Sequence, residues 1–239
     1  MNEPFNDKSE IGILIPAYNP DPLTFAELLR RVFQNCRSLN CHVLVVDDGS
    51  DPAITIPAGF SGKVALLRHS ENRGKGAALK SGFQHLLQNG SLRGVITLDC
   101  DLQHPPEKIC DFISVWNRGE KALVVGARRR SPRLMPLHRI ASNTITSFVL
   151  SRMAGQPIAD SQCGFRFIDR RVLEAFQLKE NRFHLESELL VRAGWKGFSI
   201  AHVPIPTIYN QQKSAINHVG DTLNFVSLLF KLIKERYSG

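Results

Sequence analysis

The sequence has little cysteine and arranges none of it as a CxxC pair. Its five cysteines among 239 residues are odd in number, which favours free thiols over a disulfide framework or a zinc site. The N-terminal stretch MNEPFNDKSE also lacks the basic and apolar regions of a secretory signal. We therefore expect the chain to begin in the cytosol.

Long apolar runs, low-complexity linkers and internal repeats are missing as well. No apolar stretch reaches the roughly 20 residues that span a bilayer, and no Ser/Gly/Pro-rich segment divides the chain. With 43% hydrophobic residues, the chain can bury one substantial core. We expect a single domain over residues 1–218, followed by a helix over residues 219–239 that lies in a membrane interface or packs in an oligomer.

Basic side chains outnumber acidic ones, 30 to 22, and the net charge is +8. This balance indicates acidic partners, such as nucleic acid, a nucleotide diphosphate, a lipid phosphate or an anionic bilayer, without distinguishing among them. Nucleic-acid binding fits poorly, because most aromatic residues are Phe within apolar runs and are not interleaved with basic residues. We expect no nucleic-acid partner.

Short apolar runs and amphipathic segments alternate along the chain. The runs Ile11–Ile15 and His42–Val46 end in polar loops and are typical of buried parallel strands. Helical spacing between them completes a βαβ unit. Further strands are predicted at 63–67, 94–98, 122–125 and 198–203, and helices at 21–36, 77–87, 107–116, 140–153, 185–193 and 219–235. The pattern predicts an α/β fold with a mostly parallel, doubly wound sheet and flanking helices, which binds ligands at the carboxyl ends of its strands.

The sharpest chemical signal is the segment Asp99–Asp101, directly after an apolar strand. Two carboxylates one residue apart can approach one divalent cation, and Mg²⁺ or Mn²⁺ suits such oxygen ligands and would bridge two phosphates. An ordinary turn with an Asx cap would also explain the motif. The loops Asp47–Ser50 and Pro16–Asn19 should lie at the same sheet edge. Together the three loops favour a site for base, ribose and pyrophosphate.

Six phrases, in the same order along the chain, resemble family 2 glycosyltransferases. They are Ile15–Asn19, Val46–Ser50, Asn72–Gly76, Asp99–Pro106, Gly126–Arg128 and Cys163–Arg166. The phrases are most similar to the dolichyl-phosphate mannose synthase branch, whose members adopt the GT-A nucleotide-sugar fold. The resemblance implies a metal-dependent, inverting transfer of a sugar from a GDP- or UDP-sugar to a polyprenyl-phosphate-type lipid.

The resemblance also assigns roles at the donor site. The implied nucleotide contacts are Pro16, Tyr18, Val46, Asp48, Asp99, Cys100 and Gln103, and the implied ligands of Mg²⁺ or Mn²⁺ are Asp99, Asp101 and Gln103. The implied catalytic residues are Asp101, Arg128 and Asp160. Arg128 would stabilise the departing diphosphate, whereas Asp160 would act as a general base or simply cap a turn. Lys75, in a glycine-rich turn, is a secondary phosphate candidate.

The acceptor site is implied to include Arg139, Ser142 and Lys213, although His138 can fill the place of Arg139. A lipid-phosphate acceptor predicts peripheral contact with the cytoplasmic membrane face. Two alternatives stay open. A glycan or small hydroxyl acceptor would use Asp160 or Glu186 as base, and a non-catalytic basic module would bind nucleotides or nucleic acid.

Overall fold

The first apolar runs lie side by side in one sheet of the computed structural model, which describes residues 10–119, 121–133, 135–182, 184–208 and 218–237. Strand β1 (Glu10–Ala17) lies between β2 (Asn40–Asp47) and β4 (Leu92–Thr97) and is parallel to both. Strand β3 (Val64–Arg68) extends this parallel half beyond β2. Strands β1, β2 and β4 bury most of their residues on both faces, as expected for parallel strands covered by helices, whereas β3 at the edge buries none of its residues.

The second half of the sheet contains β6 (Arg166–Asp169), a strand that the sequence did not predict. Strand β6 lies between β4 and β5 (Lys121–Arg128) and is antiparallel to both, and β7 (Ser199–Ile205) pairs in parallel with β5 at the edge. The strand order is β3-β2-β1-β4-β6-β5-β7. The predicted mostly parallel α/β sheet is therefore confirmed. Strand β6 has only four residues, all buried and beginning with an arginine, so it shows no period that could predict it.

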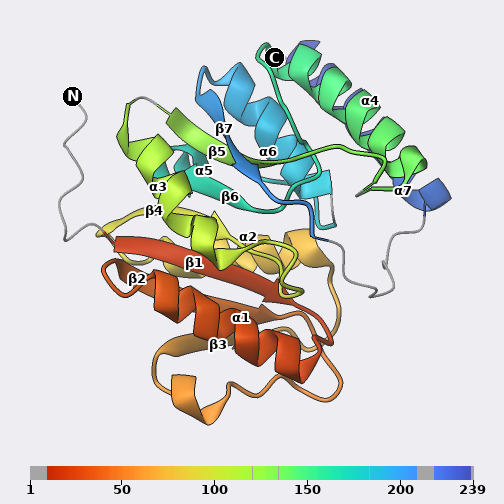
Figure 1. The fold of residues 1–239 in the computed structure, drawn as a ribbon. Coiled ribbons are helices and arrows are strands. Elements are labelled where there is room, and N and C mark those ends of the chain that lie inside the picture. Colours follow the sequence, from red (N-terminus) through yellow and green to blue (C-terminus); the bar gives the residue numbers. More distant parts are fainter. Residues whose placement is uncertain (1–9, 120, 134, 183, 209–217, 238–239) are drawn as a thin grey trace.

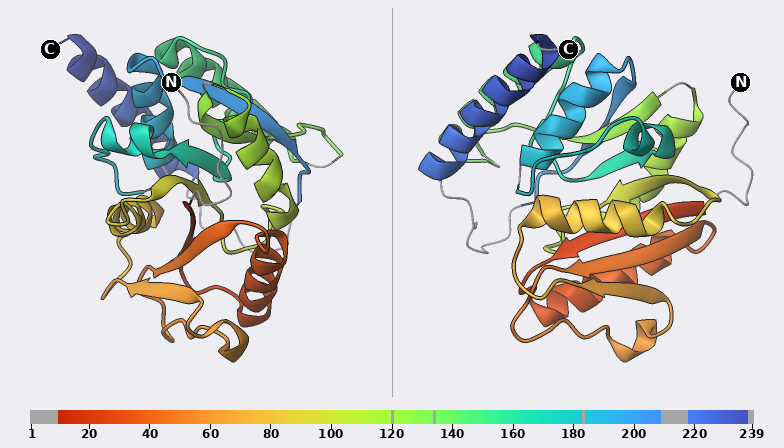
Figure 2. Two further views of the ribbon diagram at one scale, coloured as in Figure 1. Left: turned by 90° about the vertical axis from the view of Figure 1, so that its left-hand side faces the viewer. Right: turned by 180° about the vertical axis from the view of Figure 1, so that it is seen from behind.

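Helices cover both faces of the sheet, as Figures 1 and 2 show. In Figure 1, α1 (Pro22–Asn35) and α3 (Ile109–Asn117) lie in front of the sheet and α2 (Lys75–Leu86) lies behind it. Helix α1 begins where the Asp21 side chain accepts a hydrogen bond from Thr24 N at 2.8 Å, a common N-cap. The remaining short elements are η1 (Ala58–Phe60), η2 (Pro106–Lys108) and α5 (Arg170–Glu174).

Three further helices stack at one end of the molecule. Helix α6 (His184–Trp195) packs against both α4 (Leu137–Ala154) and α7 (His218–Tyr237). Helix α7 buries Leu228 and Leu232. None of the helices in the described part of the chain combines the length and apolar composition that a bilayer crossing requires.

Helices α4 and α6 approach each other closely at Gly194. A methyl group added there would lie 2.3 Å from the carbonyl oxygen of Ala154 and 2.8 Å from its Cα. Because these are backbone atoms, they cannot move aside as a flexible side chain could. Gly194 therefore sets the distance between the two helices.

We expect Gly194→Ala to lower the free energy of unfolding by about 1–3 kcal/mol, because overpacking outweighs the gain in helix propensity. Urea denaturation measures this change. Gly59→Ala is the control, since a methyl group there would meet no atom within 4 Å. Equal stability of the two variants would contradict the packing argument.

Candidate functional site

Three strand-end loops meet at one edge of the sheet. Asn19 N, after β1, donates to Ser50 Oγ, after β2, at 2.9 Å, and Asp51 N donates to Asn19 Oδ1 at 2.9 Å. The backbone of Tyr18, after β1, acts to lower the pKa of the Cys100 thiol, after β4. The structure thus brings together the three loops that the sequence expected to share an edge.

Lys75 joins this edge to the second half of the chain. Its Nζ lies 2.6 Å from Asp99 Oδ1 and 3.2 Å from Glu186 Oε1. The backbone of Gly164 borders the same group, because a methyl group added there would lie 2.7 Å from Lys75 Nζ and 2.9 Å from Glu186 Oε1. Lys75, Asp99, Glu186 and Gly164 are called the lysine cluster below.

Electrostatics hold the lysine cluster in its charged form. Burial by itself would lower the pKa of Lys75, but Asp99 and Glu186 outweigh burial and raise it above its ordinary value. Burial would raise the pKa of Asp99, and Lys75 outweighs that effect and lowers it. At neutral pH the cluster therefore contains an ammonium paired with carboxylates.

Asp101 differs from Asp99 in its surroundings. Burial and the charge of Asp99 raise the pKa of Asp101 above its ordinary value. Gln103 donates to it twice, from its backbone N at 3.0 Å and from Nε2 at 2.8 Å. Among the described residues, no group of three or more His, Cys, Asp or Glu side chains is arranged to hold a metal. Protein ligands in this loop would thus need oxygens from a bound molecule to complete a cation site.

His104 is a buried neighbour that sequence reasoning missed. Asp99 N donates to His104 Nδ1 at 3.1 Å, and burial lowers the pKa of His104. The ring is therefore neutral, with its proton on Nε2, which lies 3.9 Å from Cys163 Sγ. The sequence signal that could have identified His104 is its position within the family-like segment Asp99–Pro106.

The buried thiols at this site are unreactive. Burial raises the pKa of Cys163 and of Cys100 to about 12. A thiolate is the nucleophilic form of cysteine, so neither residue can act as a nucleophile at neutral pH. The free state of all five cysteines agrees with the sequence prediction.

Asp48 supports the glycine-rich turn instead of facing the open edge. Its carboxylate lies 2.7 Å from His69 Nδ1 and accepts from Arg73 N at 3.1 Å and Gly74 N at 2.7 Å. The side chain is only 3% exposed. These bonds fix the turn that carries Lys75. His69, which also lies 2.9 Å from Ser81 Oγ, was missed because a single histidine after a strand carries no distinctive pattern.

Asp48 and Val46 remain predicted nucleotide contacts, and the structure shows what surrounds each side chain. The Asp48 carboxylate is already occupied by the turn, and the Val46 side chain is fully buried within β2. Pro16 is also buried in β1, where it pairs with Val46. Tyr18, at 51% exposure, is the member of this set whose side chain a ligand can reach.

Arg128 and Asp160 form a buried ion pair beside the lysine cluster. Arg128 Nε and Nη2 donate to the two carboxylate oxygens at 2.7 and 2.9 Å. Asn143 Nδ2 from α4 adds a bond of 2.7 Å, and Gln162 N adds one of 3.2 Å. Burial would raise the pKa of Asp160, but the bonds from Arg128 and Asn143 lower it.

The general-base role of Asp160 stays a prediction, and the structure shows a carboxylate that is already engaged. Its side chain has no exposed surface, and both oxygens accept hydrogen bonds. A base needs a lone pair within reach of the substrate proton. Asp160 instead orients Arg128, and its bond with Gln162 N agrees with the alternative of a turn cap.

Two of the three predicted acceptor residues lie on α4. Arg139 is half-buried and Ser142 is exposed on α4, and Gln162 Nε2 donates to Ser142 Oγ at 3.5 Å. Lys213 lies outside the described residues. Helix α4 connects to the Arg128–Asp160 pair through Asn143, a residue that sequence reasoning missed.

The mostly parallel α/β sheet, with acidic strand ends and a lysine at one edge, has the fold of solved glycosyltransferases of GT-A type. The chain belongs to glycosyl transferase family 2, whose family model matches residues 12–176.

Curated relatives lie within the polyprenyl-phosphate branch. UDP-N-acetylglucosamine–dolichyl-phosphate N-acetylglucosaminyltransferase of Methanococcus voltae is 30% identical over 86% of this chain and 88% of that protein. Undecaprenyl-phosphate 4-deoxy-4-formamido-L-arabinose transferase of Erwinia tasmaniensis is 33% identical over 70% of this chain and 51% of that protein. The family and branch that the sequence resembled are thereby confirmed.

Solved structures confirm the fold. Glucosyl-3-phosphoglycerate synthase of Mycobacterium tuberculosis, in complex with Mn²⁺, UDP-glucose and phosphoglyceric acid, superposes with a TM-score of 0.71. The match covers 94% of this chain and 80% of that chain at 16% sequence identity. At this identity the likeness establishes the GT-A fold alone.

We expect Asp160→Asn to lower the free energy of unfolding by about 3 kcal/mol at pH 7, because it removes the largely buried ion pair with Arg128. The pKa of Asp160 in the folded protein lies below its ordinary value of 3.8. The contribution of Asp160 to the free energy of unfolding is therefore complete above its pKa in the unfolded chain. It is lost as the pH falls through its pKa in the folded protein. The difference between wild type and variant should be constant near neutrality and shrink below about pH 4.

Urea denaturation at several pH values measures this difference. Asp111→Asn is the control, because it removes an exposed ion pair with Lys108, a kind of pair that contributes about 0–1 kcal/mol. A difference for Asp160→Asn that persisted unchanged at pH 3 would contradict the assigned ion pair.

Proposed function

We propose that this enzyme is a metal-dependent, inverting glycosyltransferase that moves a sugar from a GDP- or UDP-sugar to a polyprenyl-phosphate-type lipid. The observation that carries the proposal is the lysine cluster at the strand-end edge, where Lys75 Nζ lies 2.6 Å from Asp99 Oδ1. This edge carries both an ammonium, which suits a diphosphate, and carboxylates, which suit a divalent cation.

The donor site would use the loop after β4 for a divalent cation. Asp99, Asp101 and Gln103 offer oxygen atoms, which Mg²⁺ and Mn²⁺ prefer. The residues fit a cation, since Asp99 and Glu186 already hold the ammonium of Lys75. When bound, a divalent cation would neutralise the diphosphate charge. To bind the cation, Asp99 would have to give up its ion pair with Lys75. Asp101 would have to give up its hydrogen bonds from Gln103.

Lys75 and Arg128 would bind the leaving diphosphate. The Asp160 carboxylate, which also accepts a hydrogen bond from Asn143, holds Arg128 in place before the donor arrives. Charges fixed in advance stabilise a developing negative charge without a cost of reorganisation. Tyr18, in the loop after β1, and Cys100, in the loop after β4, would border the nucleotide.

The acceptor would attack the anomeric carbon directly. A lipid phosphate is ionised at neutral pH and needs no general base, which agrees with the engaged carboxylate of Asp160. Arg139, Ser142 and Lys213 are proposed to bind this phosphate. A single displacement inverts the anomeric configuration, and the protonated state of Cys100 and Cys163 agrees with a mechanism without a covalent intermediate.

The names of the relatives support a lipid-phosphate acceptor, and they favour one of the two nucleotides, UDP and GDP. The Methanococcus voltae relative is named for UDP-N-acetylglucosamine and dolichyl phosphate, and the Erwinia tasmaniensis relative for undecaprenyl phosphate. The structural neighbour binds UDP-glucose. We therefore favour UDP over GDP. A lipid acceptor also places the proposed enzyme at the cytoplasmic membrane face as a peripheral protein, with residues 1–218 as the catalytic domain.

A small hydroxyl acceptor is the second candidate, because the structural neighbour holds phosphoglyceric acid. In that reaction Glu186 would replace Asp160 as the proposed base, since it lies beside Gly164 in the lysine cluster. Incubation with UDP-sugars and either undecaprenyl phosphate or phosphorylated hydroxy acids, followed by mass spectrometry, separates the two candidates. Glycosylation of the hydroxy acid alone would reject the lipid acceptor.

We expect Asp101→Asn to abolish the Mn²⁺-dependent part of nucleotide binding. Thermal shifts with GDP, UDP and their sugars, with and without Mn²⁺, measure this effect. Asp111→Asn is the control, because Asp111 is an exposed residue that pairs with Lys108. Binding that is insensitive both to EDTA and to Asp101→Asn would reject the metal-dependent donor site.

Lys75→Met should have two opposite effects. UDP affinity should fall about 10-fold to 100-fold, because a charge-assisted bond of about 1.5–3 kcal/mol is lost. Binding of Mn²⁺ without nucleotide should tighten, since Asp99 is released from its ammonium partner. Calorimetric titration of each ligand tests both, with the exposed Lys63→Met as control. Weaker Mn²⁺ binding would show that Lys75 does not compete for the carboxylates.

A further inference from the structure

Exposed apolar side chains gather on two helices. Of the nine large hydrophobic residues that are most exposed among the described residues, six lie on α4 and α7: Leu137, Ile145, Phe148, Val226, Phe230 and Ile233. Single exposed hydrophobic residues are ordinary, whereas a contiguous group marks an interaction surface.

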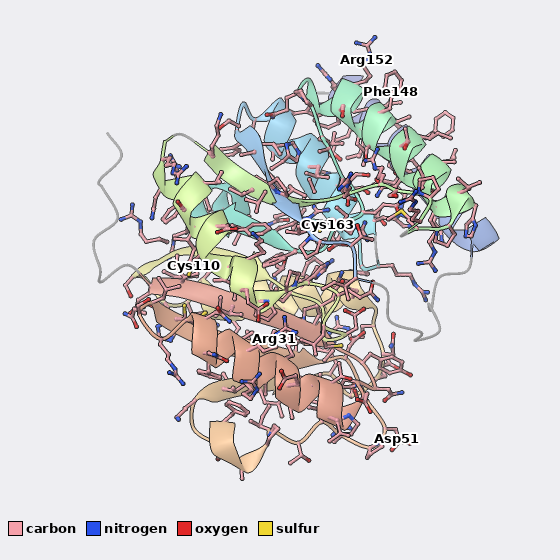
Figure 3. The ribbon with its side chains drawn as sticks, viewed as in Figure 1. Arg31, Asp51, Cys110, Phe148, Arg152 and Cys163 are labelled. Atoms are coloured by element: carbon pink, nitrogen blue, oxygen red, sulfur yellow. The ribbon has the colours of Figure 1, made fainter. Side chains whose placement is uncertain are left out.

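Helix α4 presents these residues as one continuous stripe. Leu137, Ala141, Ile145 and Phe148 follow one another at intervals of three or four residues and are all exposed, with 70%, 62% and 64% exposure for Leu137, Ile145 and Phe148. This spacing places them on one helix face. Figure 3 shows Phe148 and Arg152 projecting outward from α4. These four residues are called the α4 stripe below.

The surroundings of the α4 stripe are strongly basic. The segment from Arg128 to Ala154 contains six arginines and no Asp or Glu. The Arg152 guanidinium lies 5.8 Å from the centre of the Phe148 ring. At the far end of α4, Arg236 of α7 donates to Met153 O at 3.5 Å. An apolar helix face bordered by cations is complementary to a bilayer that carries anionic headgroups.

The opposite face of α4 belongs to the functional site. Asn143 and Ser147 are buried there, and Asn143 Nδ2 bonds Asp160, the partner of Arg128. One helix therefore carries an apolar surface on one side and a support of the diphosphate-binding arginine on the other. A lipid bilayer against the outer face would lie across this one helix from the functional site.

We propose that the α4 stripe is the surface by which the enzyme rests on an anionic lipid bilayer. The proposal deepens the proposed function, because it identifies where a lipid acceptor would reach the site. A second copy fits this surface less well. A two-fold contact would bring together the same arginines of both copies, and like charges facing each other oppose association.

Vesicle flotation with the full chain tests the proposal without donor or metal. Wild type should float with vesicles of phosphatidylcholine and phosphatidylglycerol, and binding should weaken with added salt and with phosphatidylcholine alone. Ile145→Glu and Phe148→Glu should each weaken binding about 10-fold or more, since each removes an apolar anchor and adds a repelled charge.

Leu23→Glu is the matched control, because Leu23 is 81% exposed on α1 and should leave flotation unchanged. Folding of each variant is checked by circular dichroism and by UDP binding, which should equal that of wild type. A wild type that fails to float would overturn the proposal. So would Ile145→Glu and Phe148→Glu variants that float like wild type, or a wild-type dimer that these substitutions dissociate without changing flotation.

The same variants separate this proposal from the proposed function. Transfer to a short-chain, detergent-dissolved polyprenyl phosphate does not require a bilayer, so Phe148→Glu should retain it. Normal transfer by a wild type that does not bind vesicles would overturn the membrane surface and leave the enzyme assignment standing. Vesicle binding without transfer to any polyprenyl phosphate would overturn the acceptor assignment and leave the surface standing.

Discussion

The ion pairs of Lys75 with Asp99 and Glu186 are the constraint on which the site depends. They join the start of α2, the loop after β4 and the first turn of α6, which are far apart in the sequence. A largely buried ammonium is costly unless it is paired, so these segments must meet. Gly164 completes the cluster, because any Cβ at this position would enter it. The proposed donor site thus begins with fixed charges.

Buried arginine contacts extend this order into the second half of the chain. Arg166 is 1% exposed, and its guanidinium donates to the carbonyl oxygens of Ser161, Cys163 and Glu186 at 2.6 to 2.8 Å. These hydrogen bonds connect the loop before β6 to α6 and hold Gly164 beside Glu186. The Arg128–Asp160 pair then links the same loop to α4. Through α4, the site and the proposed membrane surface belong to one rigid support.

Sequence reasoning succeeded where the signal was local and repeated. The runs in β1, β2 and β4 predicted buried parallel strands, and the polar ends of those strands predicted one shared edge. It could not reveal partners that are distant in the sequence. Asp48 follows β2 as expected, yet its carboxylate supports residues 73 and 74. Asp160 likewise has the chemistry of a base, but Arg128 and Asn143 occupy its oxygens.

The sequence by itself determined the family, the α/β class and the loops that carry the site, because these follow from short apolar runs and ordered motifs along the chain. Only the tertiary structure decided that β6 enters the sheet antiparallel, that Lys75 pairs with Asp99 and Glu186, and that α4 has one face toward the site and one toward solvent. Each of these depends on contacts between residues distant in sequence, and such contacts leave no periodic pattern in the chain.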